Sequence, residues 1–196
     1  MIVFRNELHY IVPITAVTST IQHGILSFNA ACRLNHDTIA NQIVQKRRAA
    51  VKVPNGLDLH DYVNLYFDAR NPMMYSRKEK VDTICVLRVA DAVLNIPGTV
   101  ITDSNASSDY VRFYPSPAGL QSIDFQLIYS EDWRDRDEIQ YYLKKSRKCA
   151  EVLVPHCVPF MHVTGVYVGS ESAKQALENS SLGLTIILSP IMFFAE

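Results

Sequence analysis

Glu151 is the charged residue whose surroundings in the sequence are hardest to reconcile with its charge. It begins the apolar run EVLVP at 151–155, directly after Cys149 and Ala150. A carboxylate that enters an apolar strand is costly to bury unless a partner compensates its charge. Glu151 is therefore either a strand-end acid that reaches solvent or a catalytic carboxylate in a cleft at the edge of a sheet.

A basic segment ends a predicted helix in the first third of the chain. Its charged residues are Lys46, Arg47 and Arg48, and Lys52 follows shortly after them. Basic side chains at this end of a helix complement the helix dipole. Arginine also presents fixed donors that match phosphate oxygens. The segment therefore suits either a solvated helix end or a clamp for a pyrophosphate or a DNA phosphate.

The run LHDYVNLYF at 59–67 places three polar side chains, His60, Asp61 and Tyr62, between apolar residues. Polar groups in a mostly buried strand need hydrogen-bond partners, so a structural network is the simplest interpretation. The run DARNPMMY at 68–75 then indicates a turn followed by methionines of the core.

A second polar run, TDSNASSDYVRFY at 102–114, joins turn-forming residues to aromatic ones. The residues around Asn105 suit a turn, which is the default interpretation. Tyr110 and Arg112 have side chains that can also stack on nucleic-acid bases. Either interpretation can hold without the other.

The composition fits one α+β domain that spans residues 1–196. Hydrophobic residues make up 48% and charged residues 20%, so the chain can bury a sizeable core. The net charge is -1, so any binding of nucleic acid must depend on local basic clusters. The signatures GxGxxG, GxSxG and HExxH and the P-loop are absent, and neither histidines nor cysteines have metal-ligand spacing. We expect no metal.

No signal peptide and no apolar run of membrane-spanning length is evident, so we expect a cytoplasmic protein without a membrane partner. Two long helices are expected, at Asp37–Ala50 and Asp135–Lys148. The second is highly charged and is expected to be exposed, with Tyr142 on or near its buried side. Leu182–Ala195 is expected to form a buried terminal strand. Other strands are expected at 8–14, 81–89, 150–155 and 163–168. Recurring strands with few helices favour a mixed or antiparallel sheet.

Taken in order, these segments resemble those of the DarT family of DNA ADP-ribosyltransferases. The resemblance runs from about Leu8 to Val168, and the block at 59–75 is its most specific part. The matching segments are LHYI at 8–11, VQKRRA at 44–49, LHDYVNLYFDARNPMMY at 59–75, TDSNAS at 102–107, RFY at 112–114 and CAEVLVP at 149–155.

The resemblance implies an ADP-ribosyltransferase (PARP-like) fold, in which a split mixed β-sheet surrounds an NAD cleft. It implies transfer of ADP-ribose from NAD to a nucleobase of single-stranded DNA, guanine or thymine, with release of nicotinamide. It also implies a toxin, expected to be a monomer, whose mark a macrodomain or NADAR-type antitoxin removes. The alternatives are an ADP-ribosyltransferase that acts on RNA or protein, and a non-catalytic nucleic-acid-binding module.

The resemblance also implies roles for individual residues. Glu151 matches the family's catalytic glutamate, and Arg48 matches an arginine near the reaction centre. The residues implied to bind NAD are His9, Asn29, Arg47, Asp61, Tyr62, Met74 and Tyr75. The residues implied to bind the DNA are Arg70, Asn105, Tyr110 and Arg112.

Two departures from the family pattern concern the acceptor base. Pro13 occupies a place where many members have a second histidine in the first strand. Asn105 occupies a place where many thymine-modifying members carry a histidine. Because the loop of Asn105 is expected near the acceptor base, these departures lean toward the guanine-modifying branch of the family.

Overall fold

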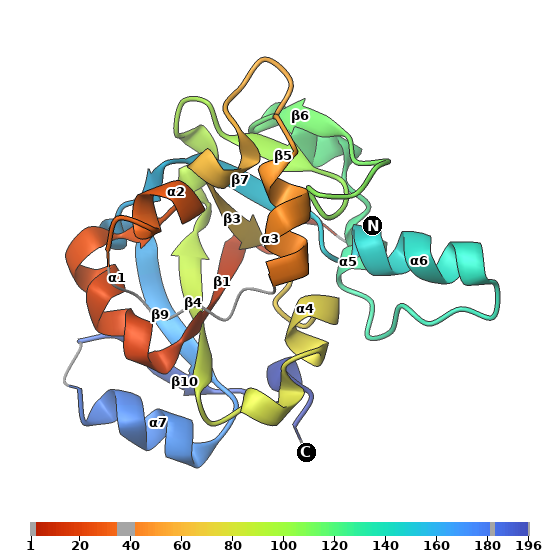
Figure 1. Cartoon of the computed structure of the whole chain (residues 1–196). Helices are drawn as coiled ribbons and strands as arrows, with labels where there is room; N and C mark the ends of the chain where they lie inside the picture. Colours follow the sequence, from red (N-terminus) through yellow and green to blue (C-terminus); the bar gives the residue numbers. More distant parts are fainter. Residues whose placement is uncertain (1–2, 35–41, 181–182, 196) are drawn as a thin grey trace.

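A computed structural model of the chain describes residues 3–34, 42–180 and 183–195 (Figure 1). The predicted start of the first long helix, at Asp37, lies outside these residues. The described part of that helix, α3 (Gln42–Ala49), ends within one residue of the predicted end at Ala50.

Eight strands form one mixed sheet in the order β10-β9-β4-β1-β3-β7-β5-β6, and β2 and β8 form a separate two-stranded sheet. All pairs in the large sheet are antiparallel except β9 with β10, which is parallel. The strands are β1 (Glu7–Pro13), β2 (Ile25–Leu26), β3 (Tyr62–Tyr66), β4 (Ile84–Ala90), β5 (Val100–Thr102), β6 (Phe113–Pro115), β7 (Glu151–Pro155), β8 (Cys157–Val158), β9 (Val163–Val168) and β10 (Ile186–Leu188).

The large sheet is split between β1 and β3. These two fully described strands pair at one position, His9 with Tyr66. By contrast, β1 pairs with β4 from Glu7 to Pro13, and β3 pairs with β7 from Tyr62 to Tyr66. Figure 1 shows the end of β3 meeting the start of β1, after which the two strands diverge. Their facing backbone edges therefore hydrogen-bond to no strand beyond that pair.

Short helices cover the two faces of the sheet. The α-helices of the described chain, besides α3, are α1 (Val17–His23), α2 (Phe28–Ala31), α4 (Pro72–Tyr75), α5 (Phe125–Ile128), α6 (Glu138–Arg147) and α7 (Glu171–Glu178). The 3₁₀ turns are η1 (Ile14–Ala16), η2 (Leu59–Asp61), η3 (Lys78–Lys80), η4 (Asp91–Asn95), η5 (Ala118–Ser122), η6 (Phe160–His162) and η7 (Pro190–Phe193).

The main hydrophobic core lies on the face of the sheet that α1, α5 and α7 cover. Alternate residues of β3 define the two faces, because successive side chains of a strand point to opposite sides. Val63 and Leu65 belong to the main core. Tyr62 and Tyr66 belong to two separate smaller clusters on the other face. Asn64 lies between Tyr62 and Tyr66 on the same face of β3 and belongs to neither cluster.

The second predicted long helix differs from its expectation in two ways. It begins at Glu138 rather than near Asp135, because the Asp137 side chain accepts a hydrogen bond from the backbone N–H of Gln140 at 2.8 Å and caps the helix. No residue of α6 is buried, which agrees with the prediction of an exposed helix. Tyr142 is 58% exposed, so its predicted place on a buried side is wrong. Figure 1 shows α6 (cyan) standing away from the sheet.

The terminal segment also differs from its expectation. Within Leu182–Ala195, the strand β10 covers Ile186–Leu188 and lies at one end of the sheet order. Leu188 is 37% exposed, so the strand is an exposed edge rather than a buried one. A 3₁₀ turn from Pro190 follows, and the buried residue there is Phe193.

A cluster of polar side chains spans β1, β4 and β9 and makes the stability of the fold depend on pH in the acid range. Glu7 accepts a hydrogen bond from Nε of Arg88 at 2.7 Å and one from the hydroxyl of Tyr167 at 3.1 Å. Nε2 of His9 lies 3.1 Å from the same carboxylate. Burial alone raises the pKa of Glu7, but the hydrogen bonds from His9 and Arg88 outweigh it and lower the pKa to about 2.

We expect Glu7→Gln to destabilise the protein by on the order of 1 kcal/mol at neutral pH. Because the folded-state pKa of Glu7 lies below its ordinary value of 4.5, its contribution is present above that value and is lost as the pH falls through about 2. Urea unfolding across this acid range should therefore show a shallower pH dependence for Glu7→Gln than for the wild type. Glu171→Gln, at an exposed position, is the control. Equal pH slopes would contradict the assignment.

Candidate active site

A buried ion pair joins the last turn of α3 to the first residue of β7. Nη1 and Nη2 of Arg48 donate to Oε2 of Glu151 at 3.1 and 3.2 Å, and Nη1 also reaches Oε1 at 3.2 Å. The Arg48 side chain is 7% exposed and the Glu151 side chain 0%. The two residues, 103 positions apart, are thus brought together. The interpretation of Glu151 as an acid that reaches solvent is wrong.

The backbone around Glu151 fixes the direction of its side chain. Val152 and Val154 of β7 belong to the main core, so Glu151 points to the opposite face of the sheet. Its backbone N–H donates to Oγ1 of Thr102 on β5 at 3.0 Å. The backbone N–H of Ala106, in the loop after β5, lies 3.4 Å from Oε1. The carboxylate is therefore held by Arg48 of α3 and by the loop after β5, while β5 itself holds the backbone of Glu151.

Burial governs the protonation of the groups around this pair. Burial raises the pKa of Glu151, and the charge of Arg48 and the N–H of Ala106 oppose the rise. Burial likewise raises the pKa of Tyr66, and the nearby Glu151 adds to the effect, so the phenol stays neutral. Burial and the charge of Arg48 together lower the pKa of His60. The arginine–carboxylate pair thus has a neutral phenol, Tyr66, and an imidazole with a lowered pKa, His60, beside it.

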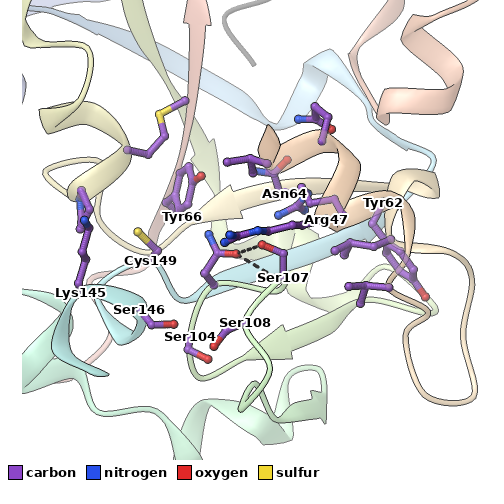
Figure 2. A pocket seen from close by; sticks show the side chains of 18 of the residues that line it. Arg47, Tyr62, Asn64, Tyr66, Ser104, Ser107, Ser108, Lys145, Ser146 and Cys149 are labelled. Carbon is purple, nitrogen blue, oxygen red and sulfur yellow. Dashed lines mark hydrogen bonds between the residues drawn. The ribbon is translucent and has the colours of Figure 1, made fainter. Parts of the chain in front are cut away.

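A cleft of about 1570 Å³ opens beside the ion pair, on the face of the sheet opposite the main core. Three successive outward residues of β3, Tyr62, Asn64 and Tyr66, line it (Figure 2). The free edge of β1 from Tyr10 to Pro13 lines it as well. The cleft therefore occupies the split in the sheet, where unpaired backbone groups of β1 and β3 face each other.

Basic residues outnumber acidic ones in the cleft. Among the described residues that line it are six lysines and arginines and two aspartates. The basic residues are Arg47, Arg48, Arg77, Arg112, Lys145 and Arg147, and the acidic ones are Asp103 and Asp109. On a chain whose net charge is -1, this local excess favours an anionic ligand.

Several residues predicted to bind NAD or DNA do lie in the cleft. They are Arg47, Tyr62, Asn105, Tyr110 and Arg112, and the predicted catalytic residue Arg48 lies there as well. Asn29 and Asp61 lie beside it, where Nδ2 of Asn29 donates to Oδ1 of Asp61 at 2.8 Å. Their chain neighbours Phe28 and His60 line the cleft, and their rings are 4.2 Å apart. The Asn29–Asp61 bond thus ties α2 to η2 at the rim.

Three other predicted residues pack elsewhere. Met74 is 0% exposed and belongs to the core. Tyr75 meets the ring of Phe194 edge-on at 5.1 Å. The guanidinium of Arg70 lies 4.0 Å from the centre of the Phe194 ring and donates to the carbonyl of Ile191. Arg70 and Tyr75 therefore hold the C-terminal segment instead of lining the cleft.

His9 also lies outside the lining of the cleft. It pairs with Tyr66 across the split, but its ring contacts Glu7 and lies 6.0 Å from the ring of Tyr167. Its Nδ1 is buried and has no hydrogen-bond partner within the described chain. The role in NAD binding that the resemblance implies for His9 stays a prediction.

The cleft contains residues that sequence reasoning missed. Figure 2 shows several of them projecting from β3 and from the end of α6. The missed residues are Asn64, Tyr66, Met73, Lys145 and Cys149. The alternation of side chains along β3 would have identified Asn64 and Tyr66, but no local pattern marks the other three. Burial raises the pKa of the Cys149 thiol to about 12, so it stays protonated and is a poor nucleophile.

The described residues lack two further features. Residues 3–34, 42–180 and 183–195 contain no group of three histidine, cysteine, aspartate or glutamate side chains that could hold a metal ion. Among the same residues, no helix combines the length and the apolar character needed to cross a membrane.

A mixed sheet split around a cleft, with a buried glutamate at the start of a strand, defines the ADP-ribosyltransferase class of fold. Within that class the chain belongs to the DarT family. The family model described as "ssDNA thymidine ADP-ribosyltransferase, DarT" matches residues 9–194.

Relatives agree with this assignment. The chain is 30% identical to a fusion protein of Thermosipho africanus named DNA ADP-ribosyl transferase-DNA ADP-ribosyl glycohydrolase, over 96% of this chain and 50% of the relative. It is 27% identical to a DNA ADP-ribosyl transferase of Thermus sp. (strain 2.9), over 85% of this chain and 82% of the relative. The chain thus spans about half the length of the fusion protein.

Solved structures confirm the predicted fold. Thermosipho africanus DarTG in complex with ADP-ribose superposes with a TM-score of 0.80 at 27% identity, over 97% of this chain and 51% of that one. Thermus sp. 2.9 DarT in complex with ADP-ribosylated ssDNA superposes with a TM-score of 0.80 at 22% identity, over 96% of each chain.

Proposed function

We propose that this chain transfers ADP-ribose from NAD to thymidine in single-stranded DNA, with release of nicotinamide. The observation that carries the proposal is the buried Arg48–Glu151 pair beside a cleft that is rich in basic residues. Membership of the DarT family, and the names of the relatives from Thermosipho and Thermus, support the same reaction. NAD is the co-substrate in this proposal.

The chemistry needs a carboxylate beside the ribose of NAD. The bond between ribose C1 and the nicotinamide nitrogen breaks, and its electron pair leaves with nicotinamide. Positive charge then develops on the ribose, and Glu151 stabilises it in a site from which water is excluded. A ring nitrogen of the base attacks C1, and its proton passes to Glu151. Arg48 aligns the pyrophosphate side of NAD so that the attack is in line.

The resting pair must rearrange before this step. Arg48 lines the cleft, whereas Glu151 is fully buried and is not among the lining residues. The arginine thus stands between the carboxylate and the cleft. NAD would draw the guanidinium toward its phosphates, because arginine matches phosphate oxygens in the same two-pronged way as it matches a carboxylate. That movement would expose Glu151 to the ribose.

We propose that the loop around Asn105 meets the acceptor base. Oδ1 of Asn105 accepts hydrogen bonds from the backbone N–H and the hydroxyl of Ser107 at 2.9 and 2.7 Å. Within the described chain, its Nδ2 makes no hydrogen bond, so the amide is available to donate to a base carbonyl oxygen. Thymine and guanine both carry one. The family description, rather than this loop, makes thymidine our choice.

Single-stranded DNA is the expected form of the acceptor. A base that reacts at a ring nitrogen on its pairing edge must leave the stack, which is least costly in a single strand. The basic residues of the cleft predict that affinity for DNA falls steeply with salt. A duplex that reacts as well as the single strand would contradict this part of the proposal.

The test is incubation of the protein with NAD and a panel of single-stranded oligonucleotides, each with one base type at a fixed position. Mass spectrometry of the products should show addition of ADP-ribose to the thymine strand alone. Addition to the guanine strand alone would support the interpretation of Asn105 and Pro13 as marks of the guanine branch. RNA and protein acceptors belong in the same experiment, since modification of either without DNA would overturn the proposal.

We also propose that the chain acts as the toxin of a toxin–antitoxin pair. The Thermosipho africanus relative carries a DNA ADP-ribosyl glycohydrolase in the same polypeptide. A separate glycohydrolase of the macrodomain or NADAR type is the corresponding partner for this chain. Co-expression with such a hydrolase should restore growth to cells that the chain alone arrests.

A further inference from the structure

A second buried ion pair joins Lys148, which follows α6, to Asp68, in the turn after β3. The side chain of Lys148 is 0% exposed and that of Asp68 14%. Nζ of Lys148 donates to Oδ2 of Asp68 at 3.0 Å and to the carbonyl oxygen of Ile128, the last residue of α5, at 2.6 Å. Lysine is almost never fully buried unless it is paired. Neither member of the pair is among the described residues that line the cleft, and the proposed reaction does not use them.

Stability alone does not account for a charged pair at this place. Ile128 and Ala150, on either side of it, belong to the main hydrophobic core. The cost of removing two charges from water often exceeds their attraction, so apolar residues of similar size stabilise a fold as well or better. An ion pair adds direction, because its hydrogen bonds fix the position of both partners. The distinctive contribution of the Lys148–Asp68 pair is therefore a fixed geometry.

The pair closes the end of the β3–β7 ladder at which Glu151 lies. Tyr66 and Glu151 form the last backbone pair of these two strands. Beyond it the two chains separate, since β3 leads through Asp68 to α4 and β7 is preceded by α6. The ends of strands open more readily than their centres. The bond between Lys148 and Asp68 ties the two chains together just beyond Glu151 and opposes this opening.

Asp68 is itself held in place by the turn in which it lies. Its Oδ1 accepts a hydrogen bond from the backbone N–H of Arg70 at 3.0 Å. Its backbone carbonyl accepts one from Nδ2 of Asn71 at 2.8 Å, and Asn71 is 0% exposed. The same turn leads into α4, of which Met73 lines the cleft. The ammonium group of Lys148 is thus anchored to a fixed point near the cleft.

We propose that Lys148 is a positioning residue for the catalytic Glu151. Its bonds to Asp68 and Ile128 fix the start of β7, and with it the direction of the carboxylate. The inference rests on the proposed function and deepens it. A displacement of about 1 Å at a reacting group can lower a rate on the order of 100-fold. Lys148 therefore acts on the reaction through Glu151, without contact with NAD or the acceptor.

A double-mutant cycle with Glu151 tests the inference. Lys148→Met keeps the length of the side chain and removes its charge. In the wild-type background it should slow nicotinamide release, measured at saturating NAD and a thymine-containing strand, on the order of 100-fold. In the Glu151→Gln background it should cause no further loss, because the carboxylate that Lys148 positions is already absent. A loss caused by general destabilisation would appear in both backgrounds.

A second variant separates the effect from folding. Lys148→Met/Asp68→Asn removes both buried charges, so its thermal unfolding temperature should lie closer to that of the wild type than Lys148→Met does. Nicotinamide release should stay as slow as in Lys148→Met. Where Lys148→Met does not fold, the double variant takes its place in the cycle.

Lys144→Met is the matched control. Lys144 lies on α6, its Nζ is 2.7 Å from Oδ2 of Asp135, and its side chain is 38% exposed. It is not among the described residues that line the cleft. The substitution thus removes a lysine–aspartate pair that is neither buried nor close to β7, and it should leave nicotinamide release at the wild-type rate.

The inference is overturned if Lys148→Met releases nicotinamide at the wild-type rate, or if it slows Glu151→Gln by the same factor as it slows the wild type. It is also overturned if neither Lys148→Met nor the double variant folds, because the pair would then be needed for the fold itself. A wild type that releases nicotinamide but modifies no DNA ends the proposed acceptor, and the cycle can still be read. A wild type that releases no nicotinamide ends both the proposed function and this inference.

Discussion

Glu151→Gln is expected to leave a folded protein that binds NAD but transfers ADP-ribose about 100- to 1000-fold more slowly than the wild type. The amide keeps the shape of the carboxylate, but it carries no negative charge to stabilise the oxocarbenium-like transition state. It also cannot accept the proton of the attacking base. Single-turnover transfer from labelled NAD to a thymine-containing strand measures the loss, and calorimetry measures the binding of NAD.

Two observations separate a catalytic effect from a structural one. Thermal unfolding should show that Glu151→Gln stays folded at the assay temperature, because the amide oxygen can still accept a hydrogen bond from Arg48, which lines the cleft. Glu178→Gln, at an exposed position on α7, should transfer ADP-ribose at the wild-type rate. Full activity of Glu151→Gln would exclude Glu151 as the catalytic group.

Arg48→Met is expected to cost about 3–5 kcal/mol of folding stability at neutral pH, because it leaves the Glu151 carboxylate buried without its partner. Activity should be lost as well. The double variant Arg48→Met/Glu151→Gln should regain most of the stability and none of the activity, since neither buried charge remains. Arg47→Met is a matched control for stability alone, because Arg47 is the exposed neighbour on the same helix and itself lines the cleft.

The pH dependence of the folding stability of Arg48→Met gives a second measurement. Without the arginine, burial raises the pKa of Glu151 further above its ordinary value of 4.5. A folded-state pKa above the unfolded value means that the folded state binds the extra proton, so stability is lost as the pH rises through that interval. Denaturant unfolding at about pH 5 and about pH 8 should therefore show Arg48→Met closer to the wild type at the lower pH. Equal deficits at both pH values would contradict a role for unpaired Glu151.

The sequence predicted the elements that hold the site better than it predicted their contacts. The apolar run after Glu151 and the basic end of the helix at Arg48 both lie where expected. Their contact across 103 residues could not be read from either segment, because each also fits a solvated position. The resemblance implied that both residues lie near the reaction centre, and the structure shows their contact and its burial.

The errors in the predicted site arise where the direction of a side chain depends on tertiary packing. Met73 and Met74 cannot be distinguished by sequence pattern. The Asn71 side chain accepts a hydrogen bond from the N–H of Met74 and begins α4. As a result, Met74 enters the core while Met73 lines the cleft. Tyr142 has the spacing of a core residue on an amphipathic helix. Its exposure follows from the position of α6 away from the sheet, which no local pattern records.

The single backbone pair between His9 and Tyr66 has a thermodynamic consequence. The two halves of the sheet are joined there by little backbone bonding, so their relative position depends on what fills the seam between them. A co-substrate that hydrogen-bonds to both strand edges would replace the missing strand pairing. Its binding would then make the two halves of the sheet unfold together. We therefore expect the protein without NAD to open locally between β1 and β3. NAD at a hundredfold excess over its Kd should add about 2.7 kcal/mol to the free energy of unfolding.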